Sequence, residues 1–107
     1  MENKITPSQL TWSEGKVKGF SGKELISLAN GSLKLVKIAA NSVYPIHVHP
    51  TKTEYTFILK GKPSFTIEGE DFEGKEGEFI VFPQNKKHGI QNNTNSECQI
   101  LVGAIEY

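Results

Sequence analysis

Arginine is absent from this sequence: all 12 basic residues are lysines, and 12 acidic residues balance them. Arginine is the residue that most often grips a carboxylate or phosphate with two parallel hydrogen bonds, so an anionic substrate would lack its usual clamp. The lysines are interspersed with acids, and the sequence shows no basic stripe or acidic tail. This charge pattern argues against nucleic acid and membrane surfaces as partners.

Cysteine and long apolar runs are also scarce. Cys98 is the only cysteine, so an internal disulfide is impossible, and its place beside the apolar run 99–102 predicts a buried, unreactive thiol. The N-terminal residues contain no apolar signal-peptide core, and no segment approaches membrane-spanning length. We therefore expect a cytoplasmic protein.

The 107 residues suit one domain, 1–107, with a single core. Short segments in which apolar and polar residues alternate are separated by turn residues, whereas helical periodicity is nowhere sustained. The segments predicted to be strands are 25–29, 32–40, 54–59, 64–68, 78–82, 88–91 and 99–105. An even series of short strands is typical of an all-β sandwich or barrel.

Four polar segments are predicted to connect these strands. Asn30-Gly31 predicts a type I′ hairpin turn between the segments 25–29 and 32–40. Further turns are expected at residues 69–71 and 74–77, and a polar loop at residues 92–96.

The three histidines fall in two short segments. His47 and His49 are two residues apart, so their imidazoles point to the same side of an extended strand. Glu54 lies an odd number of residues further on, so the proline and polar residues before it must break the strand if its carboxylate is to join them. A proline-initiated turn at residues 83–88 delivers His88 from a distant strand. This donor set suits one divalent Mn, Fe, Co, Ni, Cu or Zn ion and leaves one or two coordination positions open.

The spacing of these residues resembles the two motifs of the cupin superfamily. The first motif, glycine, His-x-His, glutamate and glycine, aligns with Asn41, His47, His49, Glu54 and Gly61. The second motif, glycine, Pro-x-Gly, histidine and asparagine, aligns with Gly77, Pro83, Asn85, His88 and Asn92. Asparagine replaces a motif glycine twice, and asparagine tolerates the left-handed backbone of a turn. Two motifs in the correct order, spanning residues 41–92, are a specific match.

The resemblance implies an all-β fold, the double-stranded β-helix (jelly-roll) of a small single-domain cupin barrel. It implies that His47, His49, Glu54 and His88 ligate the metal and that residues 1–31 form an N-terminal arm and the first strands. Small cupins commonly pair through their sheets and exchange N-terminal strands, so the resemblance also implies a homodimer.

Each candidate residue has a plain alternative explanation. Taken singly, His-x-His is usually a surface alternation, and Glu54 and His88 are usually solvated; their common register with the motif glycines argues for ligands instead. Thr56 and Ile58 share a face with Glu54, and Ile90 and Asn92 share one with His88, so these four are expected to line a mostly apolar cavity. Tyr44 and Trp12 are expected to pack against the barrel rather than to bind substrate.

The sequence favours some cupin activities over others. Every histidine belongs to the metal set, which leaves no free histidine base for a sugar epimerase. Enzymes similar to oxalate-degrading cupins, cysteine dioxygenases and sugar-phosphate isomerases generally use arginine for their anionic substrates. Two classes remain: a metal-dependent enzyme acting on a small organic molecule, and a non-catalytic module that binds a metal or small ligand. In the first class the nearest resemblance is to quercetinase-like dioxygenases, with Glu54 as a catalytic base, although a Lewis-acid isomerase or lyase has the same requirements.

Overall fold

The computed structural model describes residues 3–107, which form ten β-strands and one short 3-10 helix. The helix η1 (Pro7–Gln9) has three residues, and no helix in the described range is long and apolar enough to span a bilayer. The strands are β1 (Ser13–Glu14), β2 (Phe20–Leu28), β3 (Gly31–Ile38), β4 (Val43–His47), β5 (Lys52–Lys60), β6 (Ser64–Ile67), β7 (Glu70–Glu73), β8 (Phe79–Phe82), β9 (His88–Gln91) and β10 (Cys98–Glu106). The predicted all-β class is confirmed.

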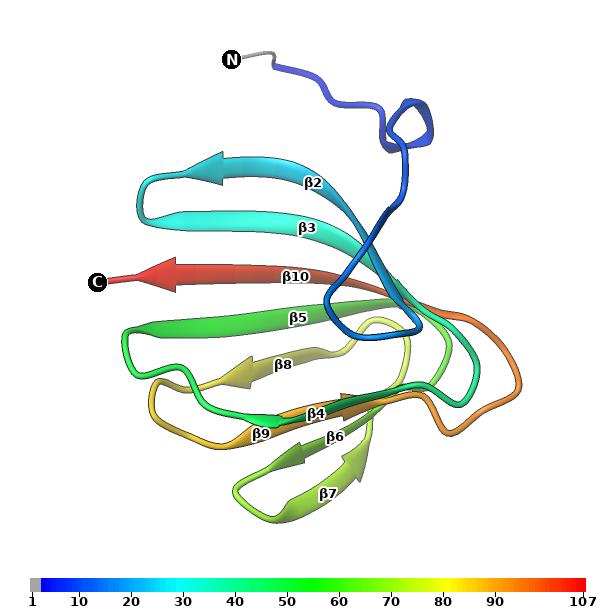
Figure 1. Cartoon of the computed structure of the whole chain (residues 1–107), viewed down its shortest axis with the longest axis vertical. Coiled ribbons are helices and arrows are strands. Elements are labelled where there is room, and N and C mark those ends of the chain that lie inside the picture. Colours follow the sequence, from blue (N-terminus) through cyan, green and yellow to red (C-terminus); the bar gives the residue numbers. More distant parts are fainter. Residues whose placement is uncertain (1–2) are drawn as a thin grey trace.

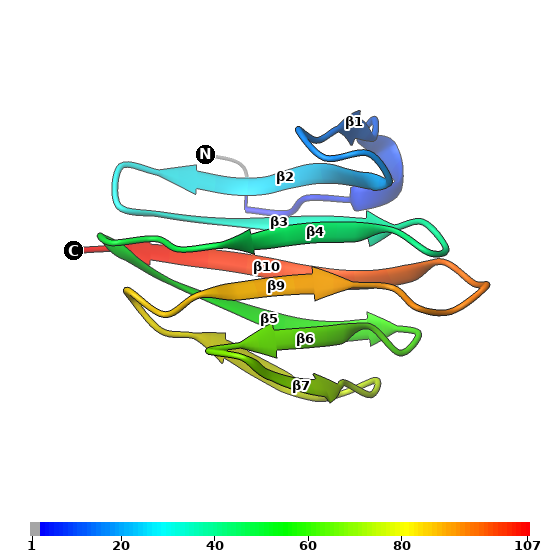
Figure 2. The same cartoon turned by 60° about the horizontal axis from the view of Figure 1, so that its bottom comes forward.

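The strands form two antiparallel sheets that face each other (Figure 1). The larger sheet has the order β1-β2-β3-β10-β5-β8, and the smaller sheet, in front in Figure 2, has the order β4-β9-β6-β7. From β3 onward the chain passes back and forth between the sheets, which is the winding of a jelly roll and confirms the predicted fold. This winding makes β4 and β9 hydrogen-bonded neighbours although they lie far apart in sequence.

The core lies between the inner faces of the two sheets. Its buried members are Phe20, Val36, Ile38, Ile58, Phe65, Phe82, Cys98 and Ile100. On each strand these residues alternate with more exposed ones, because successive side chains point to opposite faces of a sheet. Cys98 is fully buried, and burial raises the pKa of its thiol. The prediction of a buried cysteine is therefore confirmed, and the raised pKa favours the less reactive thiol form.

Both asparagines that replace motif glycines adopt the left-handed backbone expected of them. Asn41 has φ = 58° and Asn85 has φ = 64°. Gly61 and Gly77 have φ values of 86° and 87°, in the region that only glycine enters at little cost. At Gly61 a β-carbon would also lie 2.7 Å from the sulfur of Cys98, so no side chain fits there. These four positions turn the chain at the ends of strands, as the resemblance implied.

The turn predicted at Asn30-Gly31 is wrong in type, although a hairpin does form between β2 and β3. Leu28 and Gly31 are paired, so the two loop residues are Ala29 and Asn30. Neither has a positive φ, which a type I′ turn requires at both positions. Gly31 belongs to β3, where its missing side chain serves a different purpose: a β-carbon would lie 3.0 Å from the carbonyl oxygen of Ala104 on β10.

The turn predicted at residues 69–71 is also placed too late. The chain reverses at Glu68 and Gly69, which both have positive φ, and Glu70 already begins β7. This strand is exposed along its whole length and lies at the edge of the smaller sheet. Its sequence lacks a buried face, so alternation did not reveal it.

Replacing Asn41 tests the backbone assignment. Asn41→Ala should lower the free energy of unfolding by about 1 kcal/mol, because alanine is penalised in the left-handed region, whereas Asn41→Gly should change it little. Urea unfolding of both variants provides the measurement, with Asn95→Ala in an exposed loop as the matched control. If alanine and glycine at position 41 give equal stabilities, the assignment is incorrect.

Candidate metal centre

The four predicted ligands come from three strands and one connection. His47 ends β4, and His49 follows it in the segment that leads to β5. Glu54 is the third residue of β5, so the break between the two strands turns its carboxylate inward, as predicted. His88 begins β9, and the pairing of β4 with β9 sets it directly opposite His47.

The side chains of these residues converge. One donor atom from each of the four lies within 4.8 Å of the donors of the other three. The Glu54 Oε1 atom lies 3.0 Å from His49 Nε2 and 3.1 Å from His88 Nε2. The imidazole rings of His47 and His88 are 4.3 Å apart between centroids, and those of His47 and His49 are 4.8 Å apart. The sequence prediction that these four side chains come together is thus met by the geometry.

Backbone carbonyls fix the orientation of two of the rings. His47 Nδ1 lies 2.8 Å from the carbonyl oxygen of Pro45, and His88 Nδ1 lies 3.2 Å from that of Lys86. A carbonyl oxygen only accepts hydrogen bonds, so both Nδ1 atoms carry the proton that they donate. The Nε2 atoms are then free to ligate a metal. In most metal-binding histidines the ring nitrogen that does not bind the metal donates a hydrogen bond in the same way.

The electrostatics of the cluster favour the protonation states of ligands. Burial alone would raise the pKa of Glu54, but its contact with His88 and its proximity to His49 and Lys52 outweigh that effect and lower this pKa. Burial lowers the pKa of His49, and the carboxylate of Glu54 only partly opposes that effect. At neutral pH Glu54 is therefore an anion and His49 is neutral, which is the state that binds a metal cation.

The donor set and its spacing suit a transition-metal ion. With bonds of about 2.1 Å, two ligands at right angles on one ion lie about 3 Å apart, which matches the two contacts of Glu54. Nitrogen and oxygen lone pairs that face each other at this distance repel unless a metal ion or a shared proton lies between them. Three imidazoles and one carboxylate match the preferences of Mn, Fe, Co, Ni, Cu and Zn.

A cavity of about 440 Å³ opens beside the four side chains. This volume lies within the range of small-molecule sites. Its walls come from both sheets and mix apolar with polar side chains. The apolar and aromatic lining residues are Phe20, Val36, Tyr44, Phe82, Ile90, Ile100 and Val102. The cavity is therefore part apolar and part polar, because three lysines, Ser21 and Glu14 line it besides the candidate metal ligands.

The predicted lining is only partly right. Ile90 lines the cavity, but Thr56, Ile58 and Asn92 do not; they are fully buried in the packed layer around it. Asn92 has a structural role, because its amide donates hydrogen bonds to the carbonyl oxygens of residues 38, 39 and 96. Its oxygen accepts two more from Thr94, so the second motif ends in a residue that fixes a loop.

Two aromatic residues behave largely as expected. The ring of Trp12 lies 4.4 Å from the ammonium of Lys23 and 4.5 Å from that of Lys37, so the N-terminal segment packs on the outside of the barrel. Tyr44 packs edge-on against Phe20, with 5.1 Å between ring centroids, and also forms part of the cavity wall.

Sequence reasoning missed most of the cavity wall. Phe20, Val36, Ile100 and Val102 come from strands β2, β3 and β10, which lie outside or at the edge of the two motifs. Lysines also line the cavity: Lys16, Lys34 and Lys52. Strand alternation was the available signal, since Lys34 shares a face with Val36.

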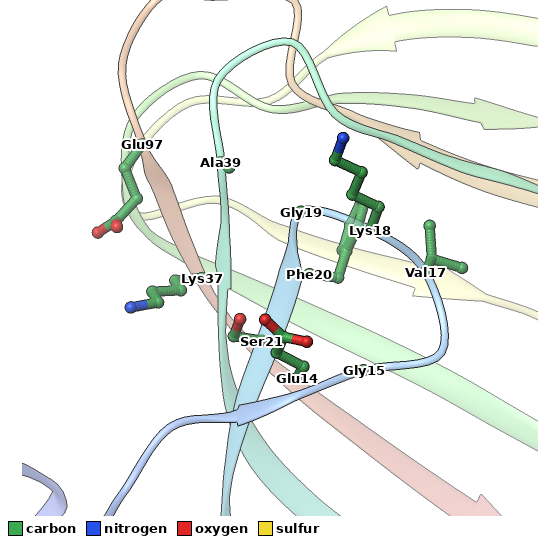
Figure 3. A pocket seen from close by; sticks show the side chains of 10 residues that line it. All are labelled: Glu14, Gly15, Val17, Lys18, Gly19, Phe20, Ser21, Lys37, Ala39 and Glu97. Atoms are coloured by element: carbon green, nitrogen blue, oxygen red, sulfur yellow. The ribbon is translucent and has the colours of Figure 1, made fainter.

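A second hollow of about 360 Å³ lies against the loop of residues 15–19, between β1 and β2 (Figure 3). Figure 3 shows charged side chains around it, among them Lys18, Lys37 and Glu97. None of the four clustered ligands lines this hollow. The chemistry of the molecule therefore concentrates in the larger cavity.

Comparison with known proteins supports the same fold. Residues 34–103 match the Cupin_2 family model, described as "Cupin domain". The uncharacterized protein MJ1618 of Methanocaldococcus jannaschii is 38% identical over 56 residues, which cover 52% of this chain and 45% of that protein. The chain thus aligns with less than half the length of this curated relative.

Solved structures resemble the whole chain. A structure titled as a predicted oxalate decarboxylase from Thermotoga maritima has a TM-score of 0.90 at 21% identity and covers 97% of this chain and 99% of that one. The cupin domain of Cnp3 from Schizosaccharomyces pombe has a TM-score of 0.88 at 13% identity, covering 98% and 74%. At these identities the likeness establishes the fold and nothing about activity.

Proposed function

Since the chain belongs to the cupin family, we propose that it is a small metal-binding cupin and a metal-dependent enzyme acting on a small organic molecule, with a dioxygenase-like site. His47, His49, Glu54 and His88 would hold one divalent transition-metal ion. The observation that carries the proposal is the approach of His49 Nε2 and His88 Nε2 to one carboxylate oxygen of Glu54, at 3.0 and 3.1 Å.

The cavity supports an enzymatic role over a purely structural one. Four protein ligands leave one or two positions on the ion free, and the ligands face a chamber large enough for an organic molecule. A bound ion supplies Lewis acidity toward a substrate oxygen, or a site at which dioxygen is activated. A structural metal site would have no need of an open cavity.

The residues around the site divide the remaining work. Glu54 is anionic at neutral pH and lies next to the open cavity, so it can accept a proton from an enol or hydroxyl group of the substrate. The apolar walls exclude water and orient the substrate. The carbonyls of Pro45 and Lys86 hold His47 and His88 in place, so the site needs little reorganisation.

We also propose that the chain forms a homodimer through the outer face of its larger sheet. Phe57 and Phe79 are paired neighbours on β5 and β8, and Tyr55 and Val81 are the next pair on these strands. Phe79 is 57% exposed, Val81 46% and Phe57 38%. A contiguous apolar patch of this kind is typical of a protein interface, and small cupins commonly pair through their sheets. A second copy is therefore the proposed partner.

The metal assignment predicts about one ion per chain in untagged protein. Replacing both His47 and His88 by alanine should reduce the metal content at least tenfold. Each substitution removes one imidazole donor, and the two remaining ligands cannot hold the ion tightly. Elemental analysis after dialysis measures the content. Lys87→Ala, next to His88 but exposed, is the matched control and should keep its metal. Equal metal content in the double variant and wild type would refute the assignment.

The catalytic assignment predicts metal-dependent dioxygen uptake with a flavonol or another enol substrate. Glu54→Gln should lower kcat by about a hundredfold or more, because the amide cannot accept the proton, and His49→Ala should abolish turnover by disrupting the ion. An oxygen electrode records the rates, and the metal content of each variant is measured in parallel. Tight metal binding without turnover over a broad substrate panel would instead identify a non-catalytic binding module.

The dimer predicts a molecular mass of twice the chain mass by light scattering at micromolar concentration. The double variant Phe79→Lys/Val81→Lys should elute as a monomer, because two ammonium groups would be placed in the apolar interface. Val43→Lys, on the smaller sheet and 55% exposed, is the matched control and should remain dimeric. A monomeric wild type, or a dimer that survives the double substitution, would contradict the proposal.

A further inference from the structure

Two lysines occupy cavity-facing positions on strands of the larger sheet. Lys34 alternates along β3 with Val36 and Ile38, which are both buried. Lys52 alternates along β5 with Glu54 and Thr56. Because successive strand residues point to opposite faces, both lysines leave the backbone on the inner face, and both line the cavity. Lys34 is exposed and Lys52 half-buried, so both charges stay in contact with water where they line the cavity.

The strand register places the two lysines on either side of the level of Glu54. Strand β10 lies between β3 and β5, and its Val102 is level with both Lys34 and Thr56. Glu54 is level with Ala104, one inward position along the strands from the level of Lys34, and Lys52 is one inward position beyond Glu54. A molecule that reaches the metal ligands from the cavity therefore lies within range of these flexible ammonium groups.

Neither lysine is neutralised by a protein carboxylate. In the range 3–107 the ion pairs are those of Glu54 with His49 and His88, and no lysine ammonium has a carboxylate within 4.0 Å. The cavity wall carries three lysines, and Glu14 is its one acid besides Glu54. The chain as a whole has zero formal net charge, so this lysine excess belongs to the cavity and not to the protein in general. A concave, positively charged wall attracts anions.

We infer that the cavity selects an organic carboxylate, whose apolar body packs between the walls, whose oxygen faces the metal ligands and whose carboxylate binds Lys34 and Lys52. This inference rests on the metal-dependent function proposed above and names its substrate class. A lysine attracts an anion as a point charge and requires no two-pronged geometry, so it serves without the arginine clamp that this sequence lacks.

Calorimetric titration of zinc-loaded, untagged protein tests the inference with two matched compounds, dihydrocaffeate and its methyl ester, under exclusion of air. Both present the same catechol oxygens and the same ring, but only the acid carries a negative charge. Wild-type protein should bind the acid about tenfold or more tightly than the ester, because a charge-assisted hydrogen bond is lost with the ester. The zinc content of every sample is measured separately.

The lysine variants locate the charge recognition. Lys34→Gln and Lys52→Gln should each weaken binding of the acid several-fold, the double variant should bind acid and ester equally, and binding of the ester should stay constant throughout. Lys60→Gln is the matched control, since Lys60 lies at the other end of β5 and does not line the cavity. It should leave the preference for the acid unchanged.

Several results would overturn the inference while leaving the metal assignment intact. They are equal binding of acid and ester by zinc-loaded wild type, binding of neither at millimolar concentration, and a preference for the acid that survives in the double lysine variant. Displacement of the acid by inorganic phosphate at lower concentration than by acetate would overturn the choice of carboxylate. Wild-type protein that retains no zinc would instead refute the proposed function, whatever the lysines do.

Discussion

One electrostatic constraint organises this molecule: the carboxylate of Glu54 and the imidazoles of His47, His49 and His88 present lone pairs to the same small volume. Such a convergence is favourable when a metal ion, or a proton shared between an imidazole and the carboxylate, lies between the donors. The fold provides the convergence through the pairing of β4 with β9, which sets His47 opposite His88. Backbone carbonyls then orient two of the rings, so the geometry is held by the barrel and not by the ligands alone.

The fold and the convergence of the four candidate ligands could be predicted from the sequence because both depend on local rules. Spacing of two residues puts His47 and His49 on one side of the chain, and turn chemistry explains why asparagine replaces glycine at Asn41, where φ is 58°. The hairpin type was wrong because the glycine of Asn30-Gly31 serves a close approach between strands, a tertiary requirement. Such contacts between β3 and β10 are not visible in a local pattern.

The cavity was the least predictable part, also for a physical reason. Its walls come from both sheets. Whether an inward-facing residue lines the cavity depends on how far along its strand it lies, and the alternation of apolar and polar residues does not reveal that position. Asn92 lies an even number of residues from His88 and was therefore expected on the same face. It is instead fully buried, and its amide donates hydrogen bonds to the carbonyl oxygens of residues 38 and 96. Lys34 is exposed, yet it lies on the same face of β3 as Val36 and lines the cavity. The absence of arginine therefore does not leave the cavity without positive charge; lysines supply it.

X-ray absorption spectroscopy of the metal-loaded, untagged protein tests the central claim most directly. The account predicts a first shell with three imidazole nitrogens and at least one oxygen at about 2.0–2.2 Å, with the outer-ring scattering of three histidines. That signature should lose one imidazole in His88→Gln. A shell built from oxygen alone, or one unchanged by that substitution, would contradict the assignment of the four ligands and with it the proposed chemistry.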